Sequence, residues 1–333
     1  MCPEKDESGE AMKGSTEQSQ FEQWHRFWRS EQPESAREAI KLPSLSLLWQ
    51  RTLEELSLPE EGSVLLELGA GAGSVSRIAA GITSMKAEKQ VAFDASTDAL
   101  ALLEHKETAV AGDIRHLPFA ANCAKLLTSQ FAVEYAGVAS MIRALDCVSS
   151  GGYFVYVLHF KGSVIDAECG SNRALVQAFT NSDFMGSAKR LLLSVLGHEV
   201  GPAQKAHVKA FKKALLDTES TLLKAPECQA KDTVLQVYNA IADMIETPAA
   251  FDLNDVLSWF ELTSAELAGY VARMSQMQSV ALSDDELLDF TDAARSMGFK
   301  ILREGVVRDT DLSGRSVPIA FHVVGQRDRS DAQ

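Results

Sequence analysis

Short apolar runs and helical segments alternate over the first half of the chain, from about residue 63 to residue 163. Each run is rich in aliphatic, β-branched or aromatic residues and is short enough to be a buried strand. The expected strands are 64–68, 90–94, 109–112, 125–131 and 153–160. Strands that alternate with helices predict a doubly wound α/β fold with a parallel sheet. The motif Ser150-Gly-Gly152, just before the last run, predicts a turn.

The strand pattern is then interrupted by a long segment with helical periodicity, from residue 164 to residue 282. Within it, Thr263-Ser-Ala-Glu266 has the form of a capping box and predicts the start of a helix. An insertion after the fifth strand is expected at the carboxyl ends of the strands, where α/β proteins bind ligands. We therefore expect residues 59–163 and 283–326 to form one domain, and residues 164–282 to form a lid over a substrate.

The last part of the chain completes the expected sheet. Ser283-Asp-Asp-Glu286 is a second capping box, and it starts an amphipathic helix that ends at Gly298. Two apolar runs follow, at 299–307 and 317–324, joined by a polar turn. They are expected to pair as antiparallel strands. The complete prediction is a seven-stranded sheet with an antiparallel edge strand and a helical insertion after the fifth strand.

The N-terminal part of the chain has a different pattern. Residues 1–20 are polar and acidic and are expected to form a disordered tail. Residues 21–58 are expected to form helices, and Phe21, Trp24 and Trp28 recur at helical spacing. This aromatic face predicts either a helix that packs on the α/β domain or a flap that closes over a ligand.

Charge and composition limit the classes of partner. The 333 residues carry a formal net charge of −14, and the pI is near 5.0. This charge repels phosphate backbones and anionic lipids, so neither nucleic acid nor a membrane is expected as a partner. No apolar run approaches the ~20 residues of a membrane span, and the first residues do not resemble a signal peptide. The five cysteines are widely spaced, which favours a reducing compartment and no metal site. We expect a cytoplasmic protein.

The first expected strand ends in a glycine-rich loop, Gly69-Ala-Gly-Ala-Gly73. Such a loop lets a backbone approach a ligand closely, at the amino end of the following helix. Dinucleotide sites require G-x-G-x-x-G, but Ser74 occupies the sixth position here. Glu67, two residues before the loop, would repel a pyrophosphate and would tolerate a ligand that carries an ammonium and a sulfonium. The loop therefore favours a cationic nucleoside over a dinucleotide.

Acidic residues also end the next two expected strands. Asp94 ends the second strand, about 20 residues beyond the loop, where an acidic side chain binds ribose hydroxyls. Asp113 follows the third strand, where it could contact an adenine amino group. Each alone could be a surface or capping residue. With Glu67, the three carboxylates at successive strand ends predict one nucleoside-type site.

Three stretches of the chain resemble the class I S-adenosylmethionine-dependent methyltransferases. They are Val64-Leu-Leu-Glu-Leu-Gly-Ala-Gly-Ala-Gly73, Ala92-Phe-Asp94 and Gly112-Asp-Ile-Arg-His-Leu-Pro-Phe119. The nearest branch looks like the small-molecule group that includes the ubiquinone and menaquinone biosynthesis methyltransferases. The resemblance covers about residues 60–160 and 283–325, and it departs from the family at Ala124-Lys125 and at Ser150. It implies a Rossmann-like sheet, S-adenosylmethionine as cofactor and S-adenosylhomocysteine as product.

The resemblance also implies a role for each site residue. The loop glycines would line the methionine portion, Glu67 would help hold its ammonium, and Asp94 would bind the ribose. The adenine would lie against Asp113 and Ile114, and the sulfonium beside Gln130 and Phe131. The implied cofactor-binding residues are thus Glu67, Gly69, Gly71, Gly73, Asp94, Asp113, Ile114, Gln130 and Phe131.

A proton acceptor is needed only if the methyl acceptor must lose a proton early. His159, at the end of the fifth expected strand, is the first candidate because imidazole titrates near neutrality. A histidine with a structural role only, hydrogen-bonded to a neighbouring loop, would have the same sequence pattern. Glu134 and Tyr135, which follow the fourth strand, are the second candidates.

The sequence therefore predicts a methyltransferase (EC 2.1.1) that acts on a small molecule by in-line displacement. Two other functions stay open: a non-catalytic module that binds the same ligand and uses its helical segment for a partner, and an NAD-dependent oxidoreductase. The pattern does not distinguish O, N, C or S as the accepting atom. A homodimer also stays open.

Overall fold

The computed structural model describes residues 24–29, 43–56, 63–82, 89–103, 108–311 and 313–329. The chain divides into two compact units, Met1–Asp166 with Ser279–Gln333, and Ala167–Gln278. Residues 24–29 are helical. The predictions for the tail 1–20 and for Phe21 lie outside the described residues.

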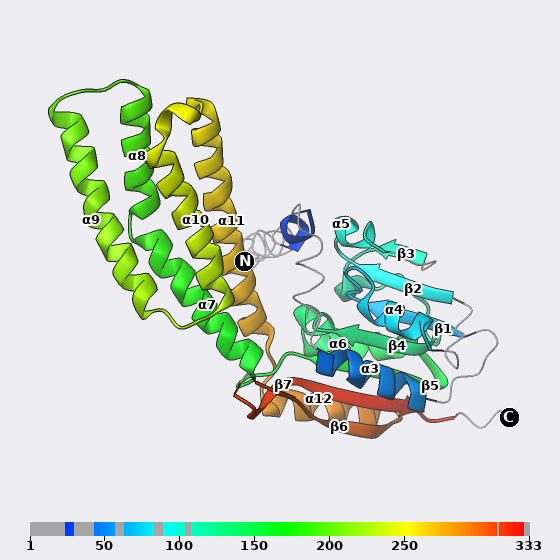
Figure 1. The fold of residues 1–333 in the computed structure, drawn as a ribbon. Coiled ribbons are helices and arrows are strands. Elements are labelled where there is room, and N and C mark those ends of the chain that lie inside the picture. Colours follow the sequence, from blue (N-terminus) through cyan, green and yellow to red (C-terminus); the bar gives the residue numbers. More distant parts are fainter. Residues whose placement is uncertain are drawn as a thin grey trace, which may run out of the picture. The chain divides into compact units, whose positions relative to one another are not determined.

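The first unit contains a seven-stranded sheet with the strand order β3-β2-β1-β4-β5-β7-β6 (Figure 1). The first five strands are parallel, and β7 runs antiparallel to both β5 and β6. The strands are β1 (Val64–Leu68), β2 (Lys89–Asp94), β3 (Thr108–Ala111), β4 (Ala124–Gln130), β5 (Val148–Leu158), β6 (Phe299–Thr310) and β7 (Ser316–Arg327). This topology confirms the predicted Rossmann-like fold.

Side chains alternate between the two faces of the sheet, and each face packs on helices. On one face, Val155 belongs to an apolar cluster with Trp49, where α3 (Pro43–Glu55) and α4 (Ser74–Ala80) pack. On the other face, Tyr156 belongs to a cluster with Met141 and Phe290, from α6 (Val138–Ala144) and α12 (Asp284–Ser296). A short helix, α5 (Thr97–Leu100), follows β2. Both faces of the sheet are therefore covered, as the doubly wound fold requires.

The expected turn at Ser150-Gly-Gly152 is wrong, because these residues lie inside β5. The pairing of β4 with β5 shifts its register between Ala124 and Leu126, opposite this segment. Gly151 has φ +65°, a left-handed conformation that glycine adopts without strain. The glycines therefore form an irregularity within a continuous strand. A 3-10 turn, η3 (Leu145–Cys147), connects α6 to this strand.

The second unit is helical and has an apolar core of its own. Its elements are α7 (Val164–Asn181, which begins in the first unit), α8 (Phe184–Leu196), α9 (Pro202–Lys224), α10 (Gln229–Glu246), η4 (Pro248–Ala250) and α11 (Leu253–Val280). Its core contains Phe179, Phe184, Phe211 and Phe260. The predicted helix start at Thr263 is wrong, because this residue is buried within α11. No described helix is both long and apolar enough to span a membrane.

The chain leaves the sheet for the helical unit and returns to it at adjacent positions. Phe160, just after β5, forms a parallel bridge with Leu282, just before α12. The Leu282 amide donates to the His159 carbonyl at 3.0 Å, and the Lys161 amide donates to the Leu282 carbonyl at 2.9 Å. The insertion thus begins and ends at a short two-stranded stem.

Candidate functional site

The glycine loop connects β1 to α4 and takes a conformation that other residues rarely adopt. The φ angles of Gly69, Gly71 and Gly73 are +63°, +54° and +76°. A Cβ atom on Gly69 would lie 2.1 Å from the Cβ of Ala132. Backbone angle and lack of space therefore both require glycine at position 69.

Glu67 is buried at the end of β1, with 2% of its surface exposed. One carboxylate oxygen accepts a hydrogen bond from the Val75 amide at 3.1 Å, and the other accepts one from the Ser76 amide at 2.8 Å. The Ser76 hydroxyl also donates to this carboxylate. Glu67 thus satisfies free amides in the first turn of α4 and fixes where the helix begins. Its predicted contact with a ligand ammonium stays a prediction.

Asp94 ties the end of β2 to the glycine loop. Its Oδ2 atom accepts from the Gly71 amide at 2.8 Å, and Oδ1 accepts from the Ser96 amide at 2.8 Å. Burial is the main influence on this carboxyl group and raises its pKa, while these amides and His25 act in the opposite direction. Each oxygen uses one lone pair in these bonds, so acceptor capacity is left for a hydroxyl group.

Asp113 and Ile114 lie where β3 leads into the short helix η1 (Ile114–His116). The Arg115 guanidinium lies 2.8 Å from the Asp113 carboxylate, which also accepts from the Arg115 amide at 2.8 Å. Burial opposes ionisation of Asp113, but these bonds outweigh it and lower its pKa. The Ile114 side chain reaches the loop, with its Cδ1 atom 3.9 Å from a Cβ built on Gly69.

Gln130 ends β4 and Phe131 follows it, and the two residues have different partners. The Gln130 side chain accepts a hydrogen bond from the Trp49 indole at 2.5 Å. Phe131 has φ +54°, which is unusual for a residue other than glycine, and its amide donates to the Val157 carbonyl at 2.8 Å. Such strained backbone often accompanies functional sites.

His159 follows β5 and forms a buried pair with Glu134 of η2 (Val133–Ala136). The distance from His159 Nδ1 to Glu134 Oε1 is 2.7 Å, and only 4% and 3% of the two residues is exposed. The imidazole lies 4.3 Å from the Phe131 ring and 6.1 Å from the Tyr135 ring, centroid to centroid. The structure thus brings the three candidate proton acceptors together beside Phe131.

Two tryptophans that the sequence interpretation did not assign to the site also lie against it. The Trp28 ring is 3.0 Å from a Cβ built on Gly71, and the Trp24 ring is 5.8 Å from that of Tyr135. Arg29 bonds Asp98 at 2.8 Å and ties the same short helix to α5. The helical spacing of the aromatic residues was the available signal, and it left open whether this face packs on the α/β domain or closes over a ligand.

The residues present fit a nucleoside-type ligand. A Cβ atom on Gly69 or Gly71 would fill the loop's cradle, and Asp94 lies at its edge with acceptor capacity left. Within the described part of the chain, no group of three or more His, Cys, Asp or Glu residues is placed to hold a metal ion.

Residues 66–156, from β1 to β5, match the family model described as a methyltransferase domain. This match confirms, for that part of the chain, the resemblance to class I S-adenosylmethionine-dependent methyltransferases and S-adenosylmethionine as the cofactor. Among curated proteins, none matches the chain in sequence.

Two solved structures illustrate the range of similarity. An S-adenosylmethionine-dependent methyltransferase from Mesorhizobium loti is 24% identical over 33% of this chain, with a TM-score of 0.28. The chain spans about half of that protein, 52%. A SAM-dependent methyltransferase from Aquifex aeolicus is 10% identical over 88% of this chain and 97% of its own, with a TM-score of 0.40.

Proposed function

We propose that this protein is a methyltransferase (EC 2.1.1) that transfers a methyl group from S-adenosylmethionine to a small-molecule acceptor. The observation that carries the proposal is the 2.8 Å bond between Asp94 and the Gly71 amide. It joins the ribose-binding carboxylate expected at the end of β2 to the loop expected to hold the methionine portion. Both lie in the segment that matches a methyltransferase domain.

In this proposal the cofactor residues act as the resemblance implies. Gly69, Gly71 and Gly73 line the methionine portion, and Glu67 helps to hold its ammonium. Asp94 binds the ribose, and the remaining contacts come from Asp113, Ile114, Gln130 and Phe131. The cofactor supplies a methyl group on a sulfonium. The protein aligns the acceptor in line with it, and alignment of this kind is worth roughly 7–11 kcal/mol.

We further propose that His159 receives the proton that the acceptor loses. The Glu134 carboxylate accepts from Nδ1 of the neutral ring and so favours the tautomer with a lone pair on Nε2. Nε2 has no hydrogen-bond partner among the described residues. Glu134 is then a positioning residue, and Tyr135 lines the acceptor side of the pair.

A small acceptor is favoured over nucleic acid by the net charge of −14. The insertion, residues 164–282, supplies the chain length for a substrate lid, and we propose that role for it.

The cofactor assignment is tested by isothermal titration calorimetry with S-adenosylhomocysteine and with NAD in parallel. We expect binding of S-adenosylhomocysteine and none of NAD. Asp94→Ala should weaken S-adenosylhomocysteine binding at least tenfold, because buried ribose hydroxyls lose their acceptor. Binding of NAD alone would support the oxidoreductase alternative and overturn the proposal.

Catalysis is tested separately, with methyl-labelled S-adenosylmethionine and fractionated small-molecule extracts. We expect label to appear in one low-molecular-weight fraction and to disappear with Asp94→Ala. Tight S-adenosylhomocysteine binding without transfer to any fraction would favour the non-catalytic module.

A further inference from the structure

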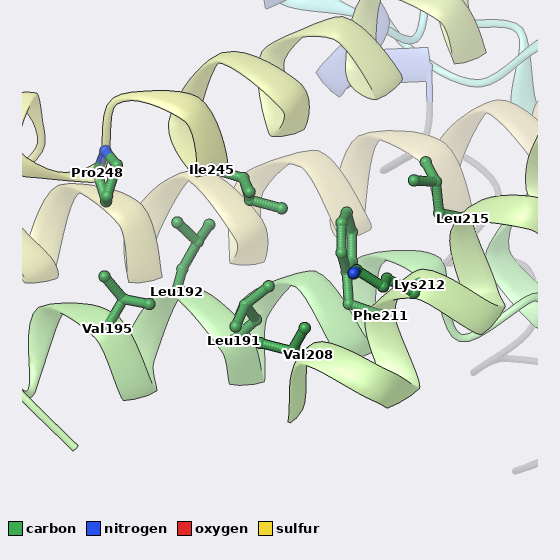
Figure 2. Close-up of a pocket in the computed structure, with 9 residues that line it drawn as sticks. All are labelled: Leu191, Leu192, Val195, Val208, Phe211, Lys212, Leu215, Ile245 and Pro248. Carbon is green, nitrogen blue, oxygen red and sulfur yellow. The ribbon is translucent and has the colours of Figure 1, made fainter. Parts of the chain in front are cut away.

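The helical unit contains a hollow of about 370 Å³ between α8, α9 and the end of α10. Figure 2 shows the residues that line it: Leu191, Leu192, Val195, Val208, Phe211, Lys212, Leu215, Ile245 and Pro248. Eight of these nine side chains are apolar. The hollow belongs to the helical unit alone and shares no residue with the methyltransferase site.

The floor of the hollow is part of the packed core. Leu192 is almost completely buried, Leu191 and Phe211 are nearly so, and all three belong to the core cluster of the unit. Val195 and Val208 are half-buried at its edge. The hollow is open to solvent on one side, so water contacts its apolar lining, and an apolar ligand that covers this surface gains free energy. Spaces between the helices of a bundle are common ligand sites, in this range of volume.

The part of the hollow formed by α8 and α9 is positively charged, whereas the end of α10 carries Asp243 and Glu246 beside Ile245. Lys212 is the only charged residue that lines it, is exposed, and forms no ion pair with a described residue. The first fifteen residues of α9 contain four lysines and no acidic residue. Helix α8 contains no acidic residue either. This local charge stands against a net charge of −14 for the protein.

We propose that this hollow binds an amphipathic ligand with an unbranched apolar tail and a single anionic head, such as an alkyl carboxylate. The tail lies on Leu191, Leu192 and Phe211, where it covers apolar surface that water otherwise contacts. The head pairs with Lys212 at the edge. A sugar or nucleotide does not fit, because the walls offer no hydrogen-bonding side chain besides Lys212.

The test is calorimetric titration of the full chain with octanoate and decanoate, below their micellar concentrations. Two added methylene groups should tighten binding about fifteenfold. Decanol, with the same tail and no charge, should bind more weakly than decanoate. Absence of binding by both carboxylates, or equal affinity for decanol and decanoate, would overturn the proposal.

Matched variants test the contributions of the anionic head and of the apolar tail separately. Lys212→Ala should weaken decanoate binding about two- to fivefold and leave decanol binding unchanged. Lys205→Ala is the control, since it removes an exposed lysine from the same helix that does not line the hollow. Val195→Phe should fill the hollow and weaken both ligands. Circular dichroism checks that each variant is folded.

Titration with S-adenosylhomocysteine in the same samples distinguishes this proposal from the methyltransferase function. S-adenosylhomocysteine affinity should be unchanged in Lys212→Ala and Val195→Phe. Equal affinity of decanoate for wild type and for Lys212→Ala would overturn the proposal, because the anionic head would then not pair with Lys212.

Discussion

Glu134 contacts His159 twice through one oxygen atom, since Oε1 accepts from the backbone amide at 3.0 Å and lies 2.7 Å from Nδ1 of the ring. The first bond fixes the histidine backbone at the end of β5, and the second fixes the ring. The other oxygen, Oε2, is buried and has no hydrogen-bond partner among the described residues. A carboxylate so poorly satisfied is costly to bury, which suggests that its orientation of the imidazole is useful.

The first prediction concerns this pair. Glu134→Gln keeps the size of the side chain, but its amide can turn and donate to the ring, so the preference for a proton on Nδ1 should fall. The ¹⁵N chemical shifts of His159 in the neutral ring report this change. Once an acceptor is known, the variant should lower kcat about tenfold or more, with little effect on KM.

Tyr135→Phe is the matched control, because it changes a neighbour of His159 without touching the carboxylate. Its His159 shifts should match those of wild type. A Glu134→Gln protein with unchanged shifts and unchanged kcat would mean that the pair is only structural.

The second prediction distinguishes two reasons for glycine at position 69: the lack of space for a Cβ atom and the backbone angle. Gly69→Ala places a Cβ against Ala132 and should lower the free energy of unfolding by about 2–4 kcal/mol. Gly162 has φ +81° but open space around it, so Gly162→Ala should cost only about 1–2 kcal/mol. Urea unfolding measures both. An equal loss of unfolding free energy in the two variants would show that the contact with Ala132 relaxes easily.

The third prediction is an opposite pH dependence of two carboxylates. The pKa of Asp94 is raised in the folded protein, so wild-type stability should fall as pH rises from 3.8 to that pKa. The pKa of Asp113 is lowered, so its contribution is present above pH 3.8 and is lost as pH falls through the folded value. Asp94→Asn and Asp113→Asn should each remove one of these slopes.

Unfolding followed by tryptophan fluorescence in a Trp259→Phe background measures these slopes, since the other three tryptophans belong to the α/β unit. If the unfolding free energy of wild type and of both Asn variants changes in parallel between pH 2.5 and pH 6, the pKa shifts assigned to Asp94 and Asp113 are contradicted.

The fourth prediction concerns His322 of β7, whose pKa is lowered to about 4 by burial and by Arg303. Because the folded value lies below the ordinary 6.5, stability is full above pH 6.5 and is lost as pH falls towards 4. Wild type should lose about 3 kcal/mol more than His322→Leu between pH 7 and pH 4. His116→Leu, at an exposed position, is the control. An equal loss in wild type and His322→Leu would exclude this residue as the source.

The fifth prediction tests whether the segment 24–29 acts as a flap. If Trp28 covers a bound ligand, Trp28→Ala should speed the dissociation of S-adenosylhomocysteine about tenfold in stopped-flow measurements. Trp259→Ala, in the helical unit, should leave the rate unchanged. A rate unaffected by Trp28→Ala would favour the alternative, a helix that only packs on the domain.

Much of the fold could be predicted because buried parallel strands are short apolar runs. Four of the first five strands begin and end within about one residue of their predicted limits. The start of β5 was missed because Ser150-Gly-Gly152 has the composition of a turn, while pairing with β4 holds it in the sheet. Likewise, Ser283 starts α12 with a true capping box, whereas the same pattern at Thr263 is buried in α11.

The parts of the site that could not be predicted depend on contacts between distant residues. Local patterns placed Glu67 and Asp94 at strand ends, but not the bonds of Glu67 to the first turn of α4. Nor did they show that Trp28 would lie on Gly71. Side-chain partners of this kind follow from the folded arrangement, which local periodicity does not encode.

The stem formed by Phe160 and Leu282 affects how readily the helical insertion can be replaced by another segment. The bridge holds both ends of the insertion side by side, and the entropic cost of closing a loop across it grows only slowly with length, by about 0.6 kcal/mol for each doubling. We therefore expect that the helical unit can be replaced as a whole while the sheet still folds. Replacing Ala167–Gln278 with a short glycine-rich linker should leave a folded sheet, and grafting a different helical segment there could alter acceptor choice while the cofactor site stays intact.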